Sequence, residues 1–363
     1  MLWEKSVSDS DYHDLGYSYG KPVITKKADG TADGTWVVLI TSGYNNTSPG
    51  DGKGHLYVLD AYTGDLIKDI ATAEGSGLAQ ISGYASDATR NNTAQYVYGG
   101  DLLGNVWRFD IDANTAFKLT TLVSASNEVQ PITVAPALGA ISNKRILFIG
   151  TGKYIEVDDT DAAHYKTQSI YAIKDDNVED TITGLRGQMV EQTLTTTAIP
   201  ATANTPAGST RTASENEDPT KKLGWYVDLG DGERQNIKAY LISGVLIVPT
   251  NIPAVGSCSV GSGWVNVFNY KTGGAVDPNV SHVVSTSTST MLTGLYFTFS
   301  DAKPDVAFFN TDTSGGSTIN DNKAATNPPC KEDPSCEKNN GSIPLPAAFS
   351  GGRATWRELI PAE

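Results

Sequence analysis

Long apolar runs are missing from this chain of 363 residues. A transmembrane helix needs about 20 consecutive apolar residues. The longest apolar run, "LISGVLIVP" at 241–249, has only the length of a strand. The sequence therefore gives no reason to expect membrane insertion by this part of the protein.

Basic residues are also scarce. The chain has 27 Lys and Arg against 41 Asp and Glu, which gives a formal net charge of −14. Nucleic acid is bound largely through basic contacts to phosphate, and anionic lipid attracts basic clusters. We therefore expect neither as a partner, whereas an acidic surface suits solubility and divalent cations.

Cysteine occurs only three times, and no Cys/His cluster has the spacing of a zinc site. Cys330 and Cys336 flank a short turn that contains a proline, and they could close a small disulfide loop in an oxidising compartment. We predict that disulfide. Cys258 has no evident partner.

Catalytic motifs are absent as well. The sequence contains no GxSxG elbow, no HExxH and no phosphate-binding P-loop. No pair of carboxylates is singled out by its spacing. We interpret each histidine as a satisfied surface residue, although the fold could still bring two carboxylates together. The four histidines are His13, His55, His164 and His282.

Short β-branched and aromatic runs separated by glycine turns are abundant, and one strand–turn–strand pattern recurs four times. Tyr57 and Trp107, in successive copies, stand 50 residues apart, as four-stranded propeller blades would place them. We predict an all-β fold, a modified β-propeller with long loop insertions, in which Tyr57, Trp107 and Trp264 are core aromatics. A β-sandwich is the alternative, but it does not explain the recurring unit. The copies are 37–46 with 55–65, 96–105 with 106–111, 146–155 with 169–176, and 244–252 with 264–274.

Two polar segments interrupt this pattern. Residues 190–222 are rich in Thr, Ala and Pro, and residues 311–342 are rich in Asn, Ser and Gly. We expect both to be surface insertions in a single propeller domain that spans 1–363. The first residues contain no signal peptide, so we interpret the chain as the C-terminal fragment of a longer protein.

A polar loop at 87–95 has the form of a weakened calcium site. Its alternate positions all carry side-chain oxygen, but only the first is anionic, and Arg90 adds a positive charge. Because calcium affinity falls with the number of charged ligands, we expect weak binding or none. A plain inter-strand loop is the alternative. The five candidate ligands are Asp87, Thr89, Asn91, Thr93 and Gln95.

Several motifs occur together and in order along almost the whole chain. As a set they resemble the C-terminal domain of the PilY/PilC family of type IV pilus biogenesis factors and tip adhesins. The motifs are "DLGYSYGKPVI" (14–24), "LYVLDAYTGDLI" (56–67), "YVYGGDLLGNVWRFD" (96–110), "GTGKYIE" (150–156), "GWYVDLGDGER" (224–234) and "GRATWREL" (352–359).

The resemblance implies a non-enzymatic factor with a modified β-propeller at the C-terminus of a long secreted protein. It implies a role in favouring pilus extension over retraction, in twitching motility and in surface attachment. The implied partners are pilins or minor pilins, and no receptor is specified. The implied location is extracytoplasmic, at the pilus tip or outer membrane surface of a Gram-negative bacterium.

The family often carries a nine-residue calcium loop, D-x-N-x-D-x-V-x-D, just before the strands that match 96–110. Asp87 matches its first ligand, whereas Asn91 and Gln95 replace two aspartates of the pattern. We therefore expect calcium modulation to be weak or lost. Two other functions stay open, namely a quinone-dependent dehydrogenase-like propeller and a carbohydrate-binding propeller.

Overall fold

Strands make up about half of the described structure, a computed structural model of the chain. Among the described residues, helix is confined to three short 3-10 helices, and none has the length and apolar character of a membrane span. The predicted all-β class is therefore confirmed. The structure describes residues 3–31, 34–75, 77–85, 91–177, 179–201, 208–218, 220–242, 244–255, 261–276, 278, 283–288, 290–299, 304–310 and 343–344.

The chain forms two compact units. The first comprises Met1–Lys153 with Ile173–Gln188, and the second comprises Tyr154–Ala172 with Met189–Glu363. The chain returns from the second unit to the first within strand β11, Ser169–Asp175. The single-domain organisation expected from the sequence stays a prediction.

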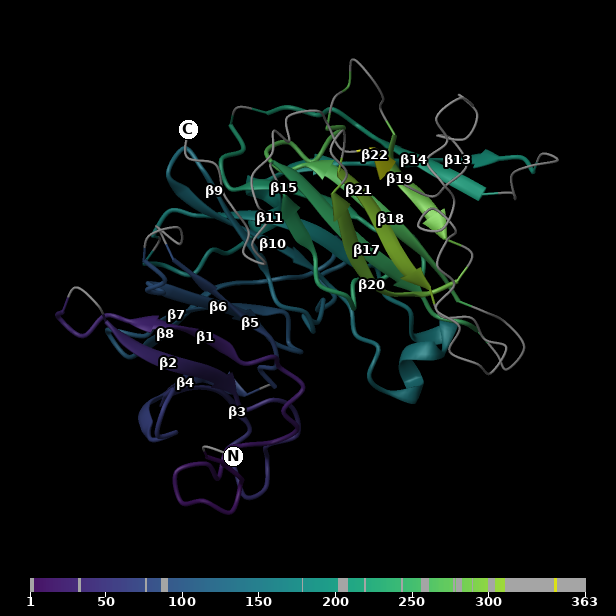
Figure 1. The fold of residues 1–363 in the computed structure, drawn as a ribbon. Helices are drawn as coiled ribbons and strands as arrows, with labels where there is room; N and C mark the ends of the chain where they lie inside the picture. Colours follow the sequence, from purple (N-terminus) through teal and green to yellow (C-terminus); the bar gives the residue numbers. More distant parts are fainter. Residues whose placement is uncertain are drawn as a thin grey trace. The chain divides into compact units, whose positions relative to one another are not determined.

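The first unit contains two four-stranded antiparallel sheets, whose strands are labelled in Figure 1. In each sheet the strands follow chain order. The central strands of each sheet, β2 with β3 and β6 with β7, are the first two copies of the recurring sequence pattern. One sheet consists of β1 (Val23–Lys27), β2 (Thr35–Thr41), β3 (Lys53–Asp60) and β4 (Leu66–Gly75). The other consists of β5 (Ile81–Tyr84), β6 (Tyr96–Gly100), β7 (Asn105–Asp110) and β8 (Thr115–Thr121). The hairpin β9 (Ala137–Ile141) and β10 (Lys144–Gly150) and the helix η3 (Leu185–Gln188) complete this unit.

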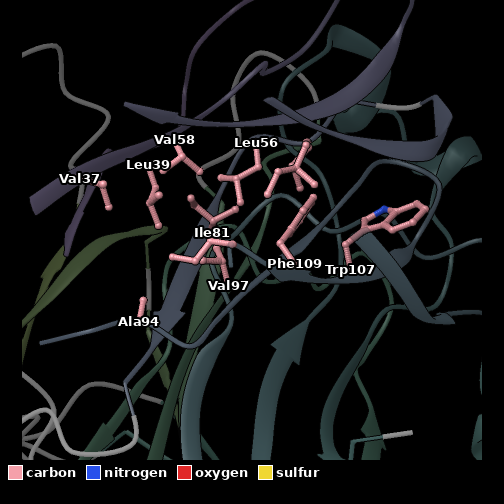
Figure 2. Packing of buried hydrophobic residues seen from close by; sticks show 12 residues of the cluster. Val37, Leu39, Leu56, Val58, Ile81, Ala94, Val97, Trp107 and Phe109 are labelled. Atoms are coloured by element: carbon pink, nitrogen blue, oxygen red, sulfur yellow. The ribbon is translucent and has the colours of Figure 1, made fainter. Parts of the chain in front are cut away.

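One hydrophobic core gathers side chains from both of these sheets (Figure 2). Alternate residues of β2 and β3 enter it, because successive side chains of a strand point to opposite faces. The intervening residues enter a second cluster together with Tyr12. The first sheet is thus buried on both faces, which explains its continuous apolar runs. The first core includes Val37, Leu39, Leu56, Val58, Ile81, Val97, Trp107 and Phe109, and the second includes Val38, Tyr57 and Leu59.

The second unit contains a parallel pair, β12 with β15, a six-stranded sheet in the order β13-β14-β19-β18-β17-β16, and a three-stranded sheet in the order β20-β21-β22. The hairpin of β17 and β18 is the fourth copy of the pattern. The strands are β12 (Val190–Gln192), β13 (Leu194–Ile199), β14 (Gly208–Ala213), β15 (Gly224–Asp228), β16 (Tyr240–Ile242), β17 (Val245–Ile252), β18 (Ser262–Asn269), β19 (Val283–Thr288), β20 (Leu292–Phe299), β21 (Pro304–Asn310) and β22 (Ile343–Pro344). Helices η1 (Val157–Thr160) and η2 (Ala162–His164) also belong to it.

The segment 190–222 differs from the surface loop expected there. It contains β12, β13 and β14, of which β12 pairs with β15 and β14 pairs with β19. The Thr-rich composition explains the difference, since threonine is β-branched and suits strands at least as well as loops. The other expected insertion, 311–342, lies outside the described residues, as do Cys258, Cys330 and Cys336. The predicted disulfide therefore stays a prediction.

The three aromatics predicted to be core residues are buried. Tyr57 is 0% exposed, Trp107 is 1% exposed and Trp264 is 7% exposed. The guanidinium of Arg211 stacks on the Trp264 ring, with its central carbon 3.7 Å from the ring centre. These residues therefore hold the sheets together and do not form an open aromatic cage.

Candidate functional site

The predicted calcium loop is only partly described, since Asp87 and Thr89 lie outside the described residues. Within the described part, Asn91 Oδ1 accepts hydrogen bonds from the Thr93 amide at 3.1 Å and the Thr93 hydroxyl at 2.6 Å. The Gln95 amide donates to the Tyr84 carbonyl at 2.9 Å. Backbone bonds also join this segment to Lys26 in β1. Residues 91–95 are therefore held partly by bonds within the segment and partly by bonds to the neighbouring strands.

We expect the loop to bind calcium with a dissociation constant no tighter than about 10⁻⁴ M, because Asp87 is its single anionic candidate ligand. Isothermal titration of the wild-type chain beside an Asn91→Asp/Gln95→Asp double variant tests this. Tighter binding by the double variant would show that missing charge limits the loop. Micromolar binding by the wild type, abolished in Asp87→Ala, would contradict the prediction.

A different cluster of potential metal ligands lies in the first unit. Its members come from separate segments: Asp14 precedes β1, Asp51 precedes β3, and His55 lies on β3. One ligand atom from each lies within 4.8 Å of the other two. His55 Nε2 is 3.1 Å from Asp51 Oδ1 and 3.7 Å from Asp14 Oδ2. The other ring nitrogen, Nδ1, is 2.8 Å from Asp69 Oδ1 on β4.

The loop between β2 and β3 brings these groups together. The Asn46 side-chain amide donates to the carbonyl of Asp14 at 3.0 Å and to that of Lys53 at 2.7 Å. The Asp51 amide donates to Asp14 Oδ1 at 2.6 Å. Gly50 is required for this approach, because a Cβ there would lie 2.3 Å from the Asn46 carbonyl oxygen. The backbone thus fixes both aspartates beside the imidazole.

Charge and burial act in opposite directions on His55. Burial lowers the pKa of its imidazole, whereas Asp69, Asp51 and Asp14 raise it, and the net result is a raised pKa. Tyr57, two residues further along β3, stacks on the imidazole with ring centres 5.9 Å apart. Its hydroxyl is buried and has no hydrogen-bond partner among the described residues.

The prediction that each histidine is a surface residue holds for His13 and His164 but is wrong for His55, which is 5% exposed. His282 lies outside the described residues. The apolar run that follows His55 marked a strand, but nothing in it indicated the carboxylates that surround the ring. Asp14 and Asp69 approach through long-range packing, and only Asp51, four residues earlier, was a nearby signal.

A second polar cluster in the first unit has a structural role. Asp175, on β11, is fully buried and pairs with Arg108 at 2.7 Å and with Arg145 at 3.2 Å. The Tyr98 hydroxyl donates to the same carboxylate at 2.6 Å. These partners lie on β6, β7 and β10. Both carboxylate oxygens of Asp175 are bonded to these partners, and the side chain is not exposed to solvent. Asp175 therefore joins strands and is not positioned to bind a ligand.

Consecutive four-stranded antiparallel sheets that share a core are the blade architecture of a β-propeller scaffold. Within this class, the family of the chain can be identified. The chain belongs to the PilY1 beta-propeller domain family, whose family model matches residues 4–205. The propeller and family predicted from the sequence are therefore confirmed.

Individual relatives agree with this assignment. The type IV pilus biogenesis factor PilY1 of Pseudomonas aeruginosa PAO1 is 27% identical over 408 residues, which cover 99% of this chain and 33% of the relative. A PilY1 homolog of Xylella fastidiosa is 31% identical over 288 residues, which cover 76% of this chain and 22% of the relative. The chain thus spans at most about a third of the length of these curated relatives.

A solved structure is also similar. The crystal structure of the Pseudomonas aeruginosa PilY1 C-terminal domain aligns with a TM-score of 0.69 and 25% sequence identity. The alignment covers 84% of this chain and 73% of that chain. The likeness therefore extends well beyond the segment that the family model matches.

Proposed function

We propose that this propeller is a domain of a type IV pilus biogenesis factor and acts as a binding scaffold without catalysis. The observation that carries the proposal is the structural match to the PilY1 C-terminal domain over 84% of the chain. The names of the relatives support the pilus role. Under this proposal the partners are pilins or minor pilins, and the location is the pilus tip or outer membrane surface.

The proposed action is to favour pilus extension over retraction, and thereby to support twitching motility. The test is an in-frame deletion of this domain from the full-length protein in a piliated host. Surface pili are counted with the retraction motor active and with it inactivated. We expect few pili in the first case and restored pili in the second, with the truncated protein still exported.

Unchanged piliation in the deletion strain would refute the proposal. Loss of pili in both backgrounds would place the domain in pilus assembly itself rather than in the balance between extension and retraction. Calcium modulation, the remaining part of the proposal, is tested by counting pili in an Asp87→Ala strain with and without added calcium. Because the loop carries one candidate carboxylate, we expect only a small difference.

Surface attachment is supported by exposed aromatic side chains in the first unit. Tyr17 and Tyr19 are 59% and 66% exposed, their ring centres are 6.4 Å apart, and Tyr19 also contacts the Tyr44 ring at 5.8 Å. Tyrosine is enriched at binding interfaces because it adds contact area at a low entropic cost.

We expect Tyr17→Ser/Tyr19→Ser to reduce attachment of piliated cells several-fold and to leave pilus number unchanged. The matched control is Tyr62→Ser, since Tyr62 is 73% exposed in the turn between β3 and β4. Attachment is measured as adherent cells per area under flow. Equal attachment by the double variant and the control would contradict a role for this pair.

A further inference from the structure

We propose that Asp14, Asp51 and His55 bind a first-row divalent transition metal ion of the zinc class, with Asp69 orienting the imidazole. This site is separate from the polar loop at 87–95. It consists of one buried nitrogen and two carboxylates from three segments of the first unit. It does not depend on the proposed pilus function.

The first argument is geometric. A tetrahedral zinc ion with bonds of about 2.0–2.2 Å separates its ligand atoms by about 3.3–3.6 Å. The distances of 3.1 Å and 3.7 Å from His55 Nε2 to the two carboxylates lie on either side of that range. All three ligand atoms also lie within 4.8 Å of one another, so one ion can be shared by the three groups after their side chains adjust.

The second argument is the orientation of the ring. Metal-binding histidines almost always engage their other ring nitrogen with a carboxylate or carbonyl, which fixes the tautomer. Asp69 Oδ1 lies 2.8 Å from His55 Nδ1, on the side of the ring away from the other two carboxylates. A proton held at Nδ1 leaves the lone pair of Nε2 directed toward Asp14 and Asp51.

The third argument is independent of these contacts. Within the part of the chain that the structure describes, the Tyr57 hydroxyl has no hydrogen-bond partner, and the side chain is 0% exposed. Its ring stacks on the His55 imidazole, with ring centres 5.9 Å apart. A buried hydroxyl without a partner is costly. A bound ion with its water molecules would supply a hydrogen-bond partner for it.

The competing explanation is a protonated imidazole that donates to Asp69 and Asp51. That arrangement uses two carboxylates, but it leaves Asp14 Oδ2 at 3.7 Å, which is too long for a hydrogen bond. It also leaves the Tyr57 hydroxyl unsatisfied. A cation explains why both Asp14 and Asp51 converge on His55 Nε2. The nitrogen ligand favours zinc and similar transition ions over calcium and magnesium, which prefer oxygen alone.

The test uses the full 363-residue chain, free of any affinity tag and stripped with a chelator. Zinc is titrated calorimetrically, and cobalt(II) is added as a spectroscopic probe. We expect one equivalent of zinc per chain and visible cobalt absorption, both lost in His55→Gln. Asp69→Asn should weaken binding by about 10–100-fold, as changes of outer-shell partners do.

Two matched controls accompany these variants. His164→Gln removes an exposed histidine that lies 3.5 Å from Asp161, and Asp65→Asn removes an exposed carboxylate in the turn between β3 and β4. Neither should change zinc binding. If His55→Gln fails to fold, Asp14→Asn serves instead, since Asp14 is only partly buried.

Three results would overturn the proposal. One is the absence of zinc binding by the wild type, which would favour the protonated imidazole. Another is zinc binding that persists in His55→Gln or, should that variant not fold, in Asp14→Asn. The last is calcium binding at this cluster at least as tight as zinc binding, which would reject the transition-metal class.

Discussion

Replacing Asp175 by alanine should lower the free energy of unfolding by about 3–5 kcal/mol. The carboxylate is fully buried and carries ion pairs to Arg108 and Arg145. Its removal leaves both guanidinium groups, each about nine-tenths buried, without their anion. It also leaves the Tyr98 hydroxyl without its acceptor. Urea unfolding followed by tryptophan fluorescence measures the loss.

The adjacent Asp176 provides a matched control. Its side chain is 50% exposed and pairs with Lys144 at the surface. Exposed ion pairs contribute about 0–1 kcal/mol, so Asp176→Ala should have a small effect. If Asp175→Ala and Asp176→Ala lowered the free energy of unfolding equally, the buried cluster would not be a major contributor to stability.

The same cluster sets a dependence of stability on pH. Burial raises the pKa of Asp175, but the Tyr98 hydrogen bond and the charges of Arg108 and Arg145 outweigh it, and the net pKa is lowered. A lowered pKa means that the contribution is fully present above the unfolded value of about 3.9 and is lost as pH falls through the folded value. Below pH 4, Asp175→Ala should therefore lose stability with falling pH less steeply than the wild type.

The parts of the fold that were predictable are local. A strand, a glycine turn and a second strand occupy about 20 residues of sequence, so the hairpins of β2–β3, β6–β7 and β17–β18 were visible as repeats. The burial of Tyr57, Trp107 and Trp264 followed from the same alternation. The alternation of apolar residues indicates which face of a strand is buried, and this is sufficient to predict hairpins and their core residues.

The parts that were not predictable depend on distant pairings. Strand β12 joins β15 in parallel across more than 30 residues, and no local signal specifies such a partner. The surroundings of His55 are similar, since Asp14 is 41 residues earlier in the chain. Composition also misled where Thr, Ala and Pro predicted a loop at 190–222, because strand β13 in that segment is itself rich in threonine. The sequence contains all of these residues, but no local pattern in it indicates which of them are in contact in the fold.

Replacing Trp107 by alanine should also lower the free energy of unfolding by about 3–5 kcal/mol, as removal of a buried tryptophan usually does. The ring is 1% exposed in the core shared by the two sheets of the first unit (Figure 2). Its indole N–H donates to Asp101 Oδ2 at 2.8 Å. Asp101 in turn accepts the amides of Leu103 and Asn105, both at 2.9 Å, and so closes the turn between β6 and β7.

This arrangement explains the motif "GDLLGNVW" at 100–107 and separates two contributions of the tryptophan. Trp107→Phe keeps most of the apolar volume but loses the N–H donor, so it should cost less than Trp107→Ala. Trp36→Ala is the control, since Trp36 is a half-buried tryptophan on β2. We expect it to cost less than half as much as Trp107→Ala in the same urea titration. A loss at Trp36 equal to that at Trp107 would mean that the core between the sheets does not dominate the stability of the first unit.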